Sequence, residues 1–355
     1  MTRDNLNHLL ASRRSVLKFG GLAGTMSLVG GLGIASGLPR RAGAAPSGTE
    51  LGRENADDTT PIKANGGQGA GFHRFNIGEI KAIALNDGGG KLSPVHPTFA
   101  PSASAEEVKA VLEKAIVPTD HVKMYFNVLV LSIGAETILI DTGNGGADGG
   151  VAGNLAAAGI KPESITGIII SHAHPDHVFG LVGADDKPKF PNAKIFMNKL
   201  EHDFWTADTL NFGDLSVGED SKRAWSKRIP EILKINKAAV QLVAGGDKVL
   251  GGLELVHTPG HTPGHTSVLV RSGQESLMAM GDLAHNYVLM FARPDWTIGF
   301  DLDRKQAVHT RRETFDRLAA DRTRVFGYHL PWPALGHVRR TGADAFEWAM
   351  EPWGW

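Results

Sequence analysis

The segment from Ser171 to Gly180 (S-H-A-H-P-D-H-V-F-G) constrains this chain most, because it crowds metal-binding side chains directly behind an apolar run that predicts a buried strand. Alternate residues of an extended segment share a face, so His172 and His174 converge on one point. The proline that follows stiffens a turn that aims Asp176 and His177 at a neighbouring point. A polar surface loop rarely holds imidazoles at this density, so the segment predicts a metal site.

One loop cannot close a coordination sphere, so further ligands must come from other strand ends. Three later apolar runs each end in one suitable side chain, within T-P-G-H, G-D and Y-H: His261, Asp282 and His329. The chain has no cysteine, so a metal must be held by His, Asp or Glu. Two nearby histidines, His257 and His265, are expected to be supporting or loop residues.

Residues 1–44 predict an export signal. The sequence S-R-R-S-V-L-K at 12–18 resembles the twin-arginine signal, an uncharged stretch follows at 19–38, and A-G-A at 42–44 suits cleavage. The rival interpretation is a membrane anchor, but the heavy glycine content makes a poor spanning helix. We therefore expect a periplasmic or secreted protein that uses the twin-arginine export machinery and keeps no stable membrane span when mature.

The remaining chain predicts a polar, glycine-rich flexible linker at 45–71 and one α/β domain at 72–355. Strands are expected at 79–85, 127–132, 136–140 and 165–170 and in several later runs, with a helix at 304–320 capped by Asp303. The 37 Lys and Arg balance the 38 Asp and Glu, which argues against a nucleic-acid-binding protein. Three tryptophans near the C-terminus can pack either on the domain itself or on a partner, so the sequence is compatible with both a monomer and a homodimer.

The motif series H-x-H-x-D-H, P-G-H, G-D and a late His is similar to that of the metallo-β-lactamase superfamily, and Asp141-Thr142-Gly143 matches a further family element. The resemblance implies a four-layer αββα sandwich with two divalent metal ions, Zn²⁺ by default, at one edge of the sheets. It implies that the first metal is held by His172, His174 and His261. It implies that the second is held by Asp176, His177 and His329, with Asp282 bridging both.

Such a site performs metal-assisted hydrolysis of a small-molecule substrate. Two cations that share a water lower its pKa toward about 7 and so supply a bridging hydroxide at neutral pH. Asp176 and Asp282 are expected to take part in catalysis, Asp176 by orienting the nucleophile. Related lactonases place a tyrosine three residues after the bridging carboxylate, where it hydrogen-bonds the substrate carbonyl. His285 occupies that position here, and the alternative is that it only lines the pocket.

The chain most resembles the methyl parathion hydrolase-like and lactonase-like members of the family, through F-P-N-A at 190–193, D-F-W at 203–205 and H-L-P-W-P at 329–333. Phe204, Trp205 and Trp332 are expected to wall the substrate pocket, with ordinary core packing as the alternative. The polar residues after Asp282 favour a lactone or carboxylic ester over an organophosphate. Two other functions stay open: a non-catalytic, metal-carrying exported binding protein and a β-lactamase, although the bridging carboxylate counts against the latter.

Overall fold

The computed structural model describes residues 71–146 and 149–352. The predicted signal peptide and nearly all of the predicted linker lie outside the described residues. Among the described helices, none is both long enough and apolar enough to cross a membrane.

Seven strands form the first sheet in chain order: β1 (Phe72–Ile77), β2 (Ile80–Leu92), β3 (Val122–Ile133), β4 (Glu136–Ile140), β5 (Gly167–Ile170), β6 (Lys194–Asn198) and β7 (Val240–Val243). Strands β1 to β4 pair antiparallel, and β4 to β7 pair parallel. Because parallel strands end at the same edge, the chain leaving β5 enters the edge where the predicted metal segment begins.

The second sheet has the order β14-β13-β12-β11-β10-β9-β8. Its strands are β8 (Lys248–Val249), β9 (Leu253–His257), β10 (Thr266–Ser272), β11 (Glu275–Ala279), β12 (Arg324–Phe326), β13 (Leu335–Arg340) and β14 (Phe346–Met350). All neighbours pair antiparallel except β11 and β12, which pair parallel. The ends of β11 and β12 therefore lie side by side, and each leads into one predicted ligand.

Side chains alternate between the two faces of each sheet and so build the layers. On β3, Leu129 and Leu131 pack between the sheets, whereas Val128 and Val130 pack toward helices on the outer face. On β11, Leu277 packs between the sheets and Met278 packs toward the opposite helix layer. The predicted four-layer αββα sandwich is confirmed.

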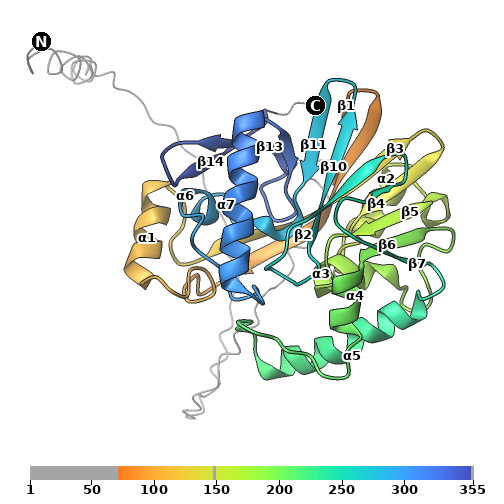
Figure 1. Cartoon of the computed structure of the whole chain (residues 1–355), viewed down its shortest axis with the longest axis horizontal. Helices are drawn as coiled ribbons and strands as arrows, with labels where there is room; N and C mark the ends of the chain where they lie inside the picture. The colour runs from red at the N-terminus through yellow and green to blue at the C-terminus, as the bar shows by residue number, and fades with distance from the viewer. Residues whose placement is uncertain (1–70, 147–148, 353–355) are drawn as a thin grey trace, which may run out of the picture. The chain divides into compact units, whose positions relative to one another are not determined.

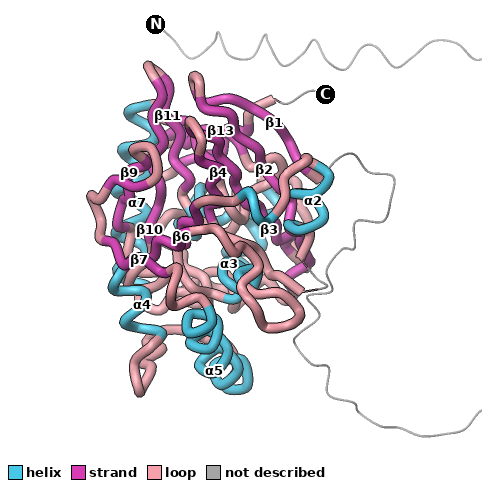
Figure 2. The backbone as a smooth tube through the Cα atoms, turned by 90° about the vertical axis from the view of Figure 1, so that its right-hand side faces the viewer, coloured by secondary structure: helices cyan, strands magenta, loops and turns pink. Residues whose placement is uncertain are grey.

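The helices cover the two outer faces (Figures 1 and 2). Helices α2 (Val151–Ala157), α4 (Lys199–Trp205) and α5 (Glu219–Ile235) lie on the first sheet. Helices α1 (Ala105–Lys114), α6 (Leu289–Ala292) and α7 (Arg304–Asp321) lie on the second. Helix α3 (Pro175–Val178) and the short 3-10 turns η2 (Pro162–Ser164), η3 (Phe179–Leu181) and η4 (Gly281–Leu283) complete the connections. The predicted cap of α7 is present, because the Asp303 carboxylate accepts from the Gln306 amide.

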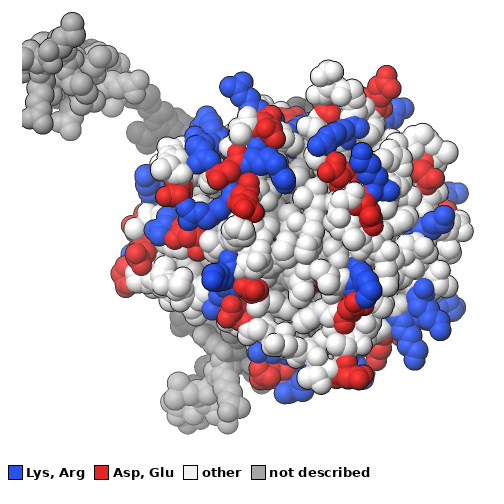
Figure 3. Space-filling view, viewed as in Figure 1, with Lys and Arg blue, Asp and Glu red and all other residues white. Residues whose placement is uncertain are grey.

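The strand predicted at 79–85 is longer than expected, because β2 continues through the turn-like sequence Asn86-Asp87-Gly88 with a bulge instead of ending at Leu85. The buried carboxylate of Asp87 accepts hydrogen bonds from the amides of Asn144 and Val151, so its polar side chain is satisfied inside the fold. A local turn signal is thus overridden by a long-range contact. On the face shown in Figure 3, basic and acidic side chains are interspersed.

Candidate metal centre

The predicted ligands meet at the edge where β5, β9, β11 and β12 end. His172 and His174 follow β5, and Asp176 and His177 lie in α3 directly after them. The later ligands come from the second sheet: His261 from the connection between β9 and β10, Asp282 from η4 after β11, and His329 after β12. The structure brings all seven predicted ligand side chains together, in clusters whose ligand atoms lie within 4.8 Å of one another.

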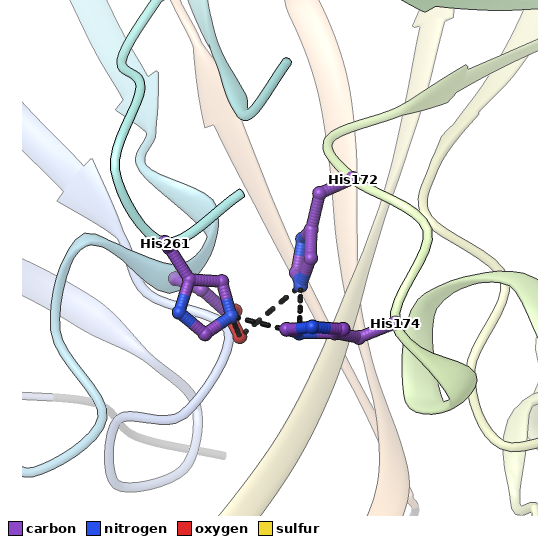
Figure 4. A group of neighbouring side chains, drawn as sticks. His172, His174 and His261 are labelled. Carbon is purple, nitrogen blue, oxygen red and sulfur yellow. Dashed lines mark hydrogen bonds and ion pairs between the residues drawn. The ribbon is translucent and has the colours of Figure 1, made fainter. Parts of the chain in front are cut away.

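The first group contains His172, His174, His261 and Asp282. Nδ1 of His174 lies 3.1 Å from Nε2 of His172 and 2.9 Å from Nε2 of His261. Oδ2 of Asp282 lies 3.5 Å from Nε2 of His172 and 3.3 Å from Nε2 of His261. Figure 4 shows His172 and His174 entering from one loop and His261 from the loop that faces it. Ring nitrogens aimed at one another at this separation suit a shared cation.

The second group contains Asp176, His177 and His329. Oδ2 of Asp176 lies 3.4 Å from Nε2 of His177 and 3.5 Å from Nε2 of His329. Asp282 reaches this group as well, with Oδ1 3.3 Å from Nε2 of His177 and Oδ2 3.1 Å from Nε2 of His329. One carboxylate therefore contacts both groups, which is the position required of a bridging ligand.

Outer hydrogen bonds orient the imidazoles. Nδ1 of His177 donates to Oδ2 of Asp141 at 2.8 Å, and Nδ1 of His261 donates to Oδ1 of Asp301 at 2.8 Å. With Nδ1 protonated, Nε2 presents its lone pair to the centre, as metal-binding histidines do. Nε2 of His177 and Oδ1 of Asp282 are buried without a hydrogen-bond partner. These side chains therefore fit divalent cations, which would satisfy the unpartnered atoms.

In the metal-free protein, the pKa values of the three histidines in the first group shift in different directions. Burial, with the neighbouring histidines, holds the pKa of His172 and His174 well below the usual range, so both are neutral and able to bind metal. Burial also acts on His261, but the carboxylates of Asp282 and Asp301 outweigh it and raise its pKa to about 9. A metal at the first group must therefore displace a proton from His261.

The two glycines of the doubled P-G motif are required because their backbones pack directly against helices. In T-P-G-H-T-P-G-H, a Cβ on Gly260 would lie 2.2 Å from the Ala307 amide of α7, and a Cβ on Gly264 would lie 2.2 Å from the Glu201 amide of α4. Each P-G turn thus packs the loop against a different helix. His261 then faces the metal groups, whereas Nε2 of His265 accepts the Asp282 amide at 2.9 Å.

Three charged residues at the site were not predicted from the sequence: Asp301, Arg311 and Glu201. The guanidinium of Arg311 is buried and donates to the carbonyls of Leu283 and Trp296, and it lies 3.8 Å from the Asp301 carboxylate. Asp301 in turn holds His261. None of these residues belongs to a recognisable motif, and although Glu201 lies three residues after β6, nothing in the local sequence links it to the ligands, so their roles emerge only from the folded arrangement.

The remaining predicted site residues lie at different distances from the metal groups. Nε2 of His285 lies 3.1 Å from Oδ2 of Asp282, and its ring stacks on His329. Trp205 is buried with its ring centroid 6.0 Å from that of His174, and Phe204 packs edge-on against Trp205. Trp332 is partly buried and packs against the core between the two sheets.

Residues 124–329 match the family model of the metallo-beta-lactamase superfamily. The solved structure of AidC, a dizinc quorum-quenching lactonase in complex with the product N-hexanoyl-L-homoserine, is similar at 33% identity, over 80% of this chain and 98% of that one, with a TM-score of 0.76. The hydrolase AbOPH of the beta-lactamase superfamily is 29% identical over 81% of this chain and all (100%) of its own, with a TM-score of 0.73. A probable metal-dependent hydrolase from Staphylococcus aureus, 17% identical over 78% of this chain and 100% of its own, shares the fold at a TM-score of 0.62. A comparison with curated proteins finds no match.

Proposed function

This chain belongs to the metallo-β-lactamase superfamily, and from that premise we propose that it is a dinuclear metal-dependent hydrolase of lactones and esters. The contacts of Asp282 carry the proposal. Its carboxylate lies within 3.5 Å of histidine nitrogens from both ligand groups, 3.3 Å from His261 and 3.1 Å from His329 among them. A carboxylate shared by two groups of imidazoles is suited to holding two cations close together.

We assign two Zn²⁺ ions to the site, because nitrogen and carboxylate ligands without thiolates suit zinc. His172, His174 and His261 would hold one ion, Asp176, His177 and His329 the other, and Asp282 both. When bound, the pair of ions would lower the pKa of a water toward about 7 and polarise the carbonyl of the substrate.

Two side chains are proposed to act on the reacting groups. Asp176 is the most open of the ligand carboxylates, with 19% of its side chain exposed against 3% for Asp282, so it is placed to orient the attacking water. His285 presents Nε2 to the same centre and would donate a hydrogen bond to the substrate carbonyl, where charge develops during attack.

The preferred substrate class is a lactone. The similarity to a dizinc lactonase over nearly the whole of that protein supports this choice. The segment after Asp282 also carries two polar side chains, His285 and Asn286, which suit a carboxylic substrate better than an organophosphate. We also propose that an apolar wall for an acyl or aryl group is formed by Phe204, Trp205 and Trp332. The proposed export through the twin-arginine machinery would place this activity in the periplasm or outside the cell.

The test is a substrate panel on purified protein of measured metal content. We expect two metals per chain and turnover fastest on N-hexanoyl-homoserine lactone or dihydrocoumarin, slower on p-nitrophenyl acetate, and slowest on methyl parathion. Chelation should abolish turnover and Zn²⁺ should restore it. A protein that holds two metals and hydrolyses none of these would instead be a metal-carrying binding protein. A β-lactam completes the panel, and hydrolysis confined to it would assign the protein to the β-lactamases.

A further inference from the structure

Glu201 is a fully buried carboxylate in the first turn of α4 that accepts four hydrogen bonds. Oε1 accepts from the Ala173 amide at 2.8 Å and from Nε1 of Trp205 at 2.9 Å. Oε2 accepts from Oγ1 of Thr262 at 2.6 Å and from the Gly264 amide at 3.0 Å. Three of these donors are N–H groups that cannot accept, so the position needs a side chain with acceptors alone.

Three of the four donors belong to the two loops that carry the first ligand group, and the fourth, Trp205, lies in α4 itself. Ala173 lies between His172 and His174, and Thr262 directly follows His261. Each oxygen of Glu201 thus holds one loop, and the carboxylate fixes the distance between them. The absence of a side chain at Gly264 lets the second loop lie directly on the α4 backbone.

We propose that Glu201 is a positioning residue that sets the geometry of the first metal group by tying its two loops together. This inference rests on the metal centre of the proposed function, but not on which substrate is cleaved. Outer hydrogen bonds of this kind influence metal affinity by about ten- to a hundredfold in other metal sites.

The second ligand group has separate supports. Asp141 holds His177, and the Tyr125 carbonyl accepts from Nδ1 of His329 at 2.8 Å. Neither contact involves Glu201. If Glu201 positions ligands, its loss should therefore weaken one metal and spare the other. If it only stabilises the fold, both metals should weaken together.

Glu201→Gln is the informative substitution, because it keeps the size and removes the charge. The new NH₂ group must face two former donors, and only the Thr262 hydroxyl can turn to accept from it. The new NH₂ group therefore points toward Thr262, where it also meets the Gly264 N–H. The remaining side-chain oxygen keeps the hydrogen bond from the Ala173 amide. The loop of His261 should loosen most.

The experiment measures metals retained per chain after dialysis of the loaded protein against increasing chelator, together with the visible spectrum of the Co²⁺-substituted protein. In Glu201→Gln we expect one metal to leave at a chelator concentration roughly ten- to a hundredfold lower than in wild type, with the other unchanged. The Co²⁺ spectrum should change for that one ion. Thr262→Val should shift the same metal less, and Thr262→Ser, which keeps the hydroxyl, should not shift it.

A control separates positioning from stability. Ile232→Ala removes a buried side chain from the same core as Trp205 and leaves the Glu201 carboxylate and its four donors in place. If it releases the first metal as readily at an equal loss of thermal stability, the proposal is wrong. Equal weakening of both metals in Glu201→Gln, or of neither, also overturns it, and Thr262→Val decides if Glu201→Gln does not fold. A wild-type protein that holds two metals yet hydrolyses nothing contradicts only the proposed function.

Discussion

The carboxylate of Asp141 accepts a hydrogen bond from Nδ1 of His177 at 2.8 Å, and Asp141 holds this position from a left-handed backbone with φ of 64°. The same carboxylate accepts the amide and the hydroxyl of Ser171. A left-handed non-glycine residue costs energy that the surrounding contacts must offset. Asp141 of the D-T-G element thus orients His177 in the second metal group, just as Asp301 orients His261 in the first.

Asp141→Asn and Asp301→Asn should therefore weaken different metals. In Asp141→Asn an NH₂ group opposes at least one former donor, and the second metal should lose roughly tenfold or more in affinity. Asp301→Asn should do the same to the first metal. Chelator titration with metal analysis measures both. If both variants released the same ion first, the division into two groups would be wrong.

Asp282→Ala should remove the link between the groups. We expect the protein to keep at most one tightly bound metal and to lose most of its hydrolytic activity, because both groups lose a shared carboxylate. The fold should persist, since Asp282 lies at a strand end and outside the hydrophobic core. Metal analysis and circular dichroism check these outcomes. Full activity with two metals would refute the ligand assignment.

The metal-free protein should become less stable at alkaline pH. The pKa of His261 is raised to about 9, since Asp282 and Asp301 outweigh burial. A raised pKa means that protonated His261 stabilises the fold fully below about 6.5 and that this contribution is lost as the pH rises through about 9. At about 1.4 kcal/mol per pKa unit, this shift corresponds to roughly 3 to 4 kcal/mol of stability.

Urea unfolding of chelator-treated protein across this interval measures the loss. His261→Gln should flatten the decline, since no proton remains to be lost at this position. Because zinc must displace the same proton, apparent metal affinity should rise over the same pH interval. A metal affinity that fell as the pH rose from about 6.5 to about 9 would contradict the assignment of His261.

The positions of the candidate ligands could be predicted because each lies just past an apolar run, and runs such as 165–170 identify strands without knowledge of the fold. Asp282 and His329 follow β11 and β12, whose parallel pairing places their ends together. Local sequence is therefore enough to locate these ligands, because each is found from a strand end and the few residues that follow it.

The supporting residues could not be predicted for the opposite reason. Asp301 lies 40 residues from His261 in sequence, and Glu201 binds atoms 28 and 61 residues away. Such contacts depend on how α4 and the loop before α7 pack, which no local pattern encodes. The doubled P-G turn was visible in the sequence, but its reason, one contact with each of two helices, was not.

His285→Phe should lower kcat/KM by roughly a hundredfold while both metals remain bound, as removal of one donor to a developing oxyanion does. His285→Tyr should retain part of the activity, because a phenol can donate the same hydrogen bond. Steady-state kinetics on the best lactone with parallel metal analysis tests this. Loss of a metal in His285→Phe would instead identify His285 as a ligand, since it also clusters with Asp282 and His329.

Gly281→Ala should disturb the metal centre beyond its cost in stability. Gly281 has φ of +56°, and a Cβ there would lie 2.7 Å from Nε2 of His265, the atom that accepts the Asp282 amide. Gly273 offers a matched control, with φ of +59° and nothing within 4 Å of an added Cβ. Both alanine variants should lose about 1 kcal/mol to backbone strain in urea unfolding. Only Gly281→Ala should push His265 away and turn Asp282, so only that variant should release metal at lower chelator concentration. Equal metal retention in the two variants would show that His265 does not position Asp282.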